Sequence, residues 1–161
     1  MTSDTRFAIR ADFPEGYDSV RALDRAVRTS GLDHTLLELI KTRVSQLNGC
    51  AYCIDMHTKD ARAAGETEQR LYGLSAWRET PFYSDAERAA LALAEAVTLV
   101  ASGDVDDDVV DEVRRHFGQD GLARIVYAIV AINSWNRLAI SGRSPVGSYQ
   151  PAADAVSPSR R

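Results

Sequence analysis

Two cysteines and a histidine near the middle of the chain have the types and spacing to do chemistry. Cys50 and Cys53 are the only cysteines in the 161 residues, and His57 follows four residues after the second. Side chains three and four positions apart share one face of a helix, so we expect these three groups to be neighbours. The pair Asn48-Gly49 is typical of a helix end and places both thiols in the first turn of a new helix. Unpaired N–H groups and the dipole at such a turn lower a cysteine pKa from about 8.5 to roughly 3.5–7.5, so the spacing predicts a reactive dithiol.

Zinc binding is the main alternative for this cluster. The two thiols and His57 offer three ligands, with Glu38 or water as a fourth. A structural zinc site normally takes a second ligand pair from elsewhere in the chain, whereas the other histidines, His34 and His116, each stand alone. A purely structural role as two small buried side chains is a third reading, which the spacing disfavours. We therefore expect redox chemistry at the thiols, with no bound metal and no cofactor.

Glu38 lies twelve residues before Cys50 and is open to two interpretations. Thr35-x-x-Glu38 matches a capping box, in which the carboxylate holds the start of the preceding helix. If the side chain instead turns inward among Leu37 and Ile40, burial raises its pKa and suits it to proton exchange with a thiol or with His57.

The rest of the chain predicts an all-α fold, a compact bundle of about six to seven helices. Apolar residues recur at helical spacing, and no stretch alternates as a half-buried strand does. Caps and breaks place helices at about residues 20–30, 34–48, 50–65, 67–80, 84–100, 107–117 and 121–140. The last of these is apolar on nearly every side and is expected at the centre. We predict one helical domain over residues 1–142, followed by a tail or oligomer arm over residues 143–161, which contains three prolines.

Composition excludes several function classes. A chain of this length with 45% hydrophobic residues can bury the core of one domain. The net charge of −4 is spread along the chain without the basic stripe that nucleic-acid binding requires. No apolar run approaches the roughly 18 residues of a membrane span, and the first residues lack the pattern of a secretory signal. We expect a cytoplasmic protein that binds neither nucleic acid nor membrane, where a C-x-x-C pair is not needed as a structural disulfide.

The reactive cluster resembles a known active-site pattern. Glu38, the gap of twelve residues and Cys50-x-x-Cys53-x-x-x-His57 resemble the signature of the alkylhydroperoxidase D family, within the carboxymuconolactone decarboxylase superfamily. Residues 41–49 before the thiols and residues 132–137 near the end of the last helix are also similar to family sequence. The likeness covers about residues 15–140.

This resemblance implies an all-helical homo-oligomer, a dimer or a trimer of dimers, that reduces a small-molecule peroxide. By the family's pattern, Cys53 attacks the peroxide oxygen and becomes a sulfenic acid, with which Cys50 condenses to form a disulfide. Glu38 and His57 then act as the proton relay. An external dithiol, a lipoyl protein or a thioredoxin-like protein, reduces the disulfide.

One departure from the family's pattern leaves alternatives open. Tyr52 stands where the best-known peroxidases carry an additional histidine, which implies a shorter relay and weaker turnover. The decarboxylase branch generally lacks paired thiols. The alternatives are a redox-sensing or stress-protective protein without efficient turnover, and an enzyme similar to carboxymuconolactone decarboxylase. Tyr52, Trp77, Phe82 and Tyr83 are candidates to line a substrate channel, although aromatic residues at such spacings are more often core.

Overall fold

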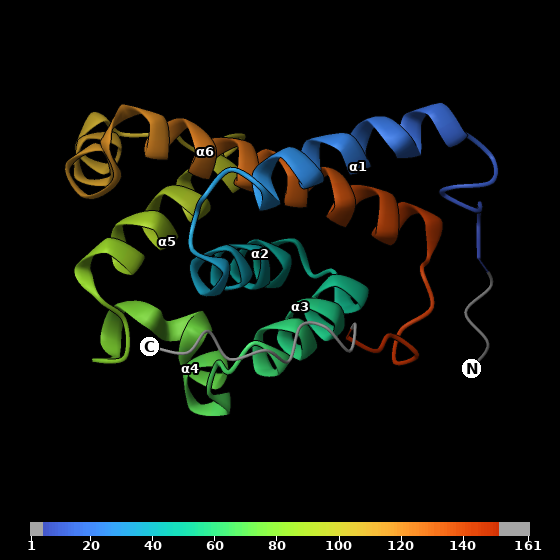
Figure 1. The fold of residues 1–161 in the computed structure, drawn as a ribbon, viewed down its shortest axis with the longest axis horizontal. Coiled ribbons are helices and arrows are strands. Elements are labelled where there is room, and N and C mark those ends of the chain that lie inside the picture. Colours follow the sequence, from blue (N-terminus) through green and yellow to red (C-terminus); the bar gives the residue numbers. More distant parts are fainter. Residues whose placement is uncertain (1–4, 152–161) are drawn as a thin grey trace.

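The computed structural model describes residues 5–151, and within them it contains helices and no strand, as predicted. None of these helices is both long and apolar enough to cross a membrane. The elements in chain order are α1 (Pro14–Arg28), α2 (His34–Asn48), α3 (Ala51–Ala63), α4 (Glu68–Gly73), the 3-10 helix η1 (Leu74–Glu79), α5 (Asp85–Thr98) and α6 (Asp107–Gly142) (Figure 1).

Helix α2 occupies the centre of the bundle. Figure 1 shows it between α1 and α6 on one side and α3 and α4 on the other, and it packs against α3, α5 and α6. Nine of its fifteen residues are buried, including the polar side chains of Glu38, Lys41 and Ser45. The sequence placed the last helix at the centre, but α6 keeps one face exposed at Tyr127 and Val130.

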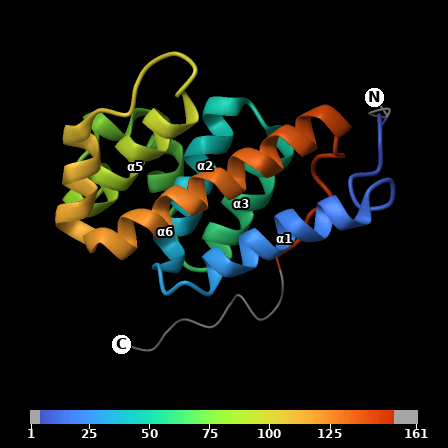
Figure 2. The ribbon, with the colours of Figure 1, turned by 90° about the horizontal axis from the view of Figure 1, so that it is seen from above.

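Helix α6 joins the two helices predicted for residues 107–117 and 121–140. They meet at Gly118, whose φ of 69° and ψ of 179° break the helical path. From there to its end α6 lies alongside α1, as Figures 1 and 2 both show. The helix predicted for residues 67–80 is instead two pieces, because Ala76 has non-helical dihedrals and residues from Leu74 onward form a 3-10 helix.

The two end segments of the described chain are hydrogen-bonded to α6 and to α3. The Arg6 backbone N–H donates to Gly142 at 3.0 Å, which joins the N-terminal segment to the end of α6. Residues 143–151 then run beside α3, where the Lys59 ammonium donates to the Tyr149 carbonyl at 3.0 Å. Residues 152–161 of the tail or arm predicted from the sequence lie outside the described residues.

The break in α6 gives a stability prediction. A Gly118→Ala substitution should cost about 1–3 kcal/mol, because a residue with a Cβ is strained at these dihedrals although no neighbouring atom obstructs it. Gly103→Ala is the matched control, since Gly103 also has open space around it but no positive φ, and it should stay within about 0.5 kcal/mol of wild type. Urea unfolding measures both changes. Equal stability of the two variants would contradict the assignment of strain to Gly118.

Candidate active site

The two thiols lie at the start of α3, as the sequence predicts. Gly49 adopts the left-handed conformation, with φ of 68°, and ends α2. Cys50 is therefore the N-cap of α3, and its Sγ accepts the backbone N–H of Cys53 at 3.4 Å. Both cysteines are free thiols with 1% of their surface exposed. The helix start thus holds one sulfur in the position that a capping side chain usually takes.

The pair carries its negative charge on Cys50. A hydrogen bond from the Cys53 thiol lowers the pKa of Cys50 to about 7, and this effect outweighs burial, which acts in the opposite direction. The backbone N–H groups of Cys53 and Tyr52 lower it further. The same interaction raises the pKa of Cys53, because its thiol donates to Cys50 and because it is buried. Cys50 is thus the sulfur of the pair that ionises more readily, and Cys53 is its hydrogen-bond donor.

Asn136 on α6 also holds the thiols, and sequence reasoning did not assign it to the site. Its side chain is 0% exposed and is hydrogen-bonded to both cysteines, which lowers the pKa of each. The carboxamide is fixed at both ends, since Nδ2 donates to Ser45 Oγ at 3.0 Å and Oδ1 accepts from Asn48 at 2.9 Å. The similarity of residues 132–137 to family sequence was the signal that could have identified it.

Glu38 turns inward and pairs with His57. Its Oε2 accepts a hydrogen bond from His57 Nδ1 at 2.8 Å, and the two side chains are 1% and 2% exposed. The capping-box interpretation is wrong, because Asp33 is the N-cap of α2 and accepts from the Leu36 N–H. With Nδ1–H directed at the carboxylate, Nε2 is the ring nitrogen that can accept or release a proton.

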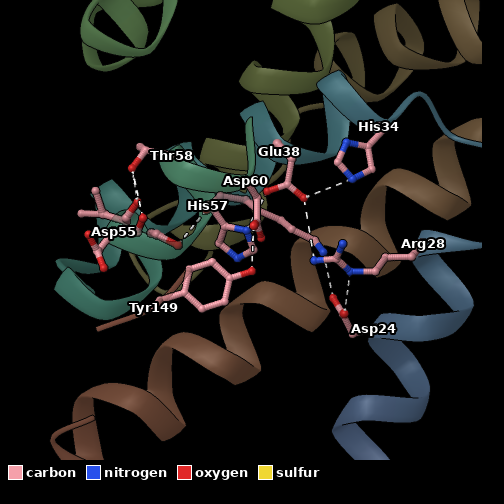
Figure 3. Close-up of polar contacts among 12 residues, drawn as sticks. Asp24, Arg28, His34, Glu38, Asp55, His57, Thr58, Asp60 and Tyr149 are labelled. Atoms are coloured by element: carbon pink, nitrogen blue, oxygen red, sulfur yellow. Dashed lines mark hydrogen bonds and ion pairs between the residues drawn. The ribbon is translucent and has the colours of Figure 1, made fainter. Parts of the chain in front are cut away.

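The pKa of Glu38 moves opposite to the sequence expectation. Burial raises it, as expected, but the hydrogen bond and charge of His57, together with Lys41 and Arg28, bring the net pKa below its usual value. Oε1 lies 3.8 Å from the Arg28 guanidinium, and Figure 3 shows Glu38 between Arg28 and His57. Glu38 is therefore an anion that holds the imidazole, rather than a raised-pKa acid.

A group of three ligand-bearing side chains converges beside the thiols. Glu38, His57 and Asp60 each place one oxygen or nitrogen within 4.8 Å of the others. The zinc alternative from the sequence used the thiols, which are not part of this group. The Arg28 guanidinium acts electrostatically on both carboxylates, and Tyr149 donates a 2.7 Å hydrogen bond to Asp60. These contacts place positive charge near both carboxylates and a hydrogen-bond donor on Asp60.

A cavity of about 410 Å³ opens beside Cys53 and His57. Cys50 does not line it, so Cys53 is the sulfur that a molecule in the cavity would meet. The apolar and aromatic part of the wall comprises Ile9, Tyr17, Tyr52, Met56, Trp135 and Pro145. Of the aromatic candidates from the sequence, only Tyr52 lines this cavity, because Trp77, Phe82 and Tyr83 pack in a separate core cluster.

Comparison with known proteins identifies the family. Residues 11–96, more than half of the chain, match the carboxymuconolactone decarboxylase family. The chain belongs to this family. The match includes Glu38, both thiols and His57, whereas Asn136 lies beyond it. The all-α fold and the family resemblance that the sequence predicted are therefore confirmed.

Three relatives of this family member refine the comparison. YdfG of Bacillus subtilis, an uncharacterised protein, is 49% identical over 128 residues, which cover 80% of this chain and 87% of YdfG. The structure of ATU0492 from Agrobacterium tumefaciens, a protein of unknown function suggested to be an antioxidant defence protein AhpD, matches with a TM-score of 0.87 at 42% identity, covering 91% of this chain and all of that one. A peroxidase-related protein from Silicibacter sp. TM1040 has the same fold, with a TM-score of 0.73 at 22% identity over 93% of this chain and 77% of its own. The family match and the ATU0492 structure together support a role related to the peroxidases or the decarboxylases of the family, while the Silicibacter structure shows the shared fold.

The hydrogen bond from Asn136 gives a prediction about thiol reactivity. Asn136→Ala should shift the pH midpoint of thiol alkylation upward from about 7, because the Cys50 thiolate loses a donor. The measurement is the rate of alkylation of the reduced protein as a function of pH. Ser134→Ala is the control, since Ser134 is a half-buried neighbour on α6 whose hydroxyl donates to the Val130 carbonyl and makes no hydrogen bond to either thiol among the described residues. An unchanged midpoint in a folded Asn136 variant would contradict the assignment.

Proposed function

We propose that this protein is a thiol-dependent peroxidase that cycles a Cys50–Cys53 disulfide. The observation that carries the proposal is the joint arrangement of the thiol pair and the Glu38–His57 pair at one cavity. Cys53 and His57 both line the cavity, Glu38 lies behind the imidazole, and Cys50 lies behind Cys53. Covalent catalysis needs a nucleophile, a base at the same cavity and a group that orients the base.

The first step is attack of the Cys53 sulfur on the terminal oxygen of a hydroperoxide. A sulfur–oxygen bond forms and the oxygen–oxygen bond breaks, so the sulfur is oxidised to a sulfenic acid and the peroxide is reduced to an alcohol. The Cys53 proton passes to His57 Nε2 and then to the departing alkoxide. Glu38 accepts the Nδ1–H throughout and stabilises the imidazolium, as the carboxylate of a Ser-His-Asp triad does.

The second step uses the charge that rests on Cys50. The Cys50 thiolate attacks the Cys53 sulfenic acid, a disulfide forms, and hydroxide leaves and takes up a proton as water. A sulfur with a pKa of about 7 is substantially ionised at neutral pH, which favours this step. An external dithiol, a lipoyl protein or a thioredoxin-like protein, then reduces the disulfide and is itself oxidised.

Cys53 is assigned the attacking role because of access, although the resting charge lies on Cys50. Only Cys53 lines the cavity, so a peroxide bound there meets this sulfur first. The raised pKa of Cys53 means that its proton must leave during the attack, and His57 is the base on the same face of α3. We further propose that the enzyme works as a cytoplasmic homo-oligomer, a dimer or a trimer of dimers.

The cysteine roles predict different products in two variants. After one equivalent of organic hydroperoxide, Cys50→Ser should accumulate a sulfenic acid at Cys53, because the resolving sulfur is missing. Cys53→Ser should remain unoxidised, and the wild type should form an intramolecular disulfide that an added dithiol reverses. Mass spectrometry with a sulfenic-acid trap distinguishes these species. Oxidation that changes the association state without catalytic peroxide loss would instead favour the redox-sensing alternative, and thiol-independent turnover of a carboxylated lactone would favour the decarboxylase.

The proton relay predicts a rate effect without loss of the thiol pair. His57→Asn should lower kcat/KM for peroxide by roughly 10²–10⁴, the usual contribution of a positioned acid–base group, and Glu38→Gln should lower it less because the imidazole remains. Steady-state peroxide consumption with a dithiol present measures both. His34→Asn is the control. His34 is half-exposed, and its Nε2 lies 3.9 Å from Oε1 of Glu38, which is beyond hydrogen-bond distance. A His57 variant with wild-type turnover would contradict the relay.

A further inference from the structure

Most of the charged side chains that line the cavity have an ion-pair partner, and one arginine has none among the described residues. Asp24 lines the cavity, but its carboxylate is already paired with the buried Lys41 at 2.8 Å and with Arg28 at 3.0 Å. Arg28 in turn also faces Glu38. Each of these four charged side chains therefore already has an ion-pair partner within the protein.

Arg21 is the lining residue that this network of ion pairs does not include. It lines the same cavity from α1, and no carboxylate within the described part of the chain lies within ion-pair distance of it. A second cation stands nearby, because the Arg10 guanidinium lies 5.7 Å from the ring centre of Tyr17, which also lines the cavity. The cavity is therefore lined by an exposed guanidinium that is available to bind an anion.

The rest of the cavity wall indicates the size and polarity of the ligand that would fit. The volume of about 410 Å³ falls in the range of small-molecule sites and far exceeds the space that hydrogen peroxide needs. Tyr17 and Trp135 meet edge to face with ring centres 5.5 Å apart, and Tyr52 and Met56 complete an apolar and aromatic surface. Such a surface favours an aromatic or branched apolar group over a polar one.

We propose that the cavity binds an organic hydroperoxide that carries a carboxylate on an apolar, preferably aromatic, body, and that Arg21 binds the carboxylate. This inference rests on the proposed function, because the hydroperoxide end must reach Cys53. A guanidinium pairs with a carboxylate through two parallel hydrogen bonds, which fixes the orientation of the ligand as well as its affinity. Arg21 thus acts as a specificity-determining residue for the substrate class.

The test separates binding from turnover by using an unreactive ligand. The probe is the tertiary alcohol that forms when the para-carboxylate derivative of cumene hydroperoxide is reduced. The comparison compound is the methyl ester of this alcohol. Calorimetry measures the dissociation constant of each. Arg21→Gln should weaken binding of the carboxylate about tenfold and leave the ester unchanged, and Arg21→Lys should restore part of the loss. Arg25→Gln is the matched control, because Arg25 is an exposed arginine one turn further along α1 that does not line the cavity.

The outcomes decide the inference independently of the proposed function. Equal effects of Arg21→Gln on acid and ester, an equal effect of Arg25→Gln, or no binding of the acid by the wild type would each overturn the role of Arg21. Turnover of the two corresponding hydroperoxides is then measured with a dithiol present. If the enzyme is a peroxidase, the acid should show the lower KM, and only this preference should disappear in Arg21→Gln. If the wild type binds the acid through Arg21 but turns over neither hydroperoxide, only the peroxidase proposal is overturned.

Discussion

The start of α3 is the feature on which the site depends. The left-handed conformation of Gly49 ends α2 and turns the chain so that Cys50 becomes the N-cap of the next helix. A sulfur in this position accepts a backbone N–H and lies at the positive end of the helix dipole, and both effects favour its ionised form. The same turn supplies Cys53 as the hydrogen-bond donor to Cys50, and the helix then carries His57 on the same face. One helix start therefore positions both sulfurs and the imidazole, which in the proposed cycle are the two redox partners and the proton carrier.

Helix α2 contributes Glu38 to the site, and burying its charged side chains costs free energy. It lies at the centre of the bundle, yet it buries a carboxylate at Glu38 and an ammonium at Lys41. Each buried charge is expensive unless it is paired, and each is: Glu38 with His57 and Arg28, and Lys41 with Asp24. Because hydrophobic residues would fill these positions at lower cost, the pairs are best explained by the chemistry at the cavity.

The sequence predicted the local features of the site more reliably than its long-range contacts. Three local features were predicted and are present: the helix end at Gly49, the capping box at Ser84 and the helix start at the C-x-x-C pair. Each depends on residues close together in the chain. The direction of Glu38 was left open because it depends on which residue caps α2. The lowering of its pKa comes from Arg28, Lys41 and His57, which only the folded chain brings near it.

Residues far along the chain were the ones that sequence reasoning missed. Asn136 acts on the thiols from α6. Asp60 lies beside Glu38 and His57, and it accepts a hydrogen bond from Tyr149, which lies beyond the end of α6. A polar residue within an apolar helix and a tyrosine in a proline-containing segment carry no spacing pattern that links them to the cysteines. Similarly, Trp77 and Tyr52 look alike as candidates for a substrate channel, and only packing places one in the core and the other at the cavity.

The ionisation of Cys50 is the central claim, and the ultraviolet absorbance of the thiolate tests it most directly. Titration of the reduced wild type with pH should show one thiolate forming with an apparent pKa of about 7. That transition should persist in Cys53→Ser, whose hydroxyl and backbone N–H can still donate to the Cys50 sulfur, and should be absent in Cys50→Ser. A wild type whose thiols ionise only above their ordinary pKa of about 8.5, or a transition that survives in Cys50→Ser, would contradict the account.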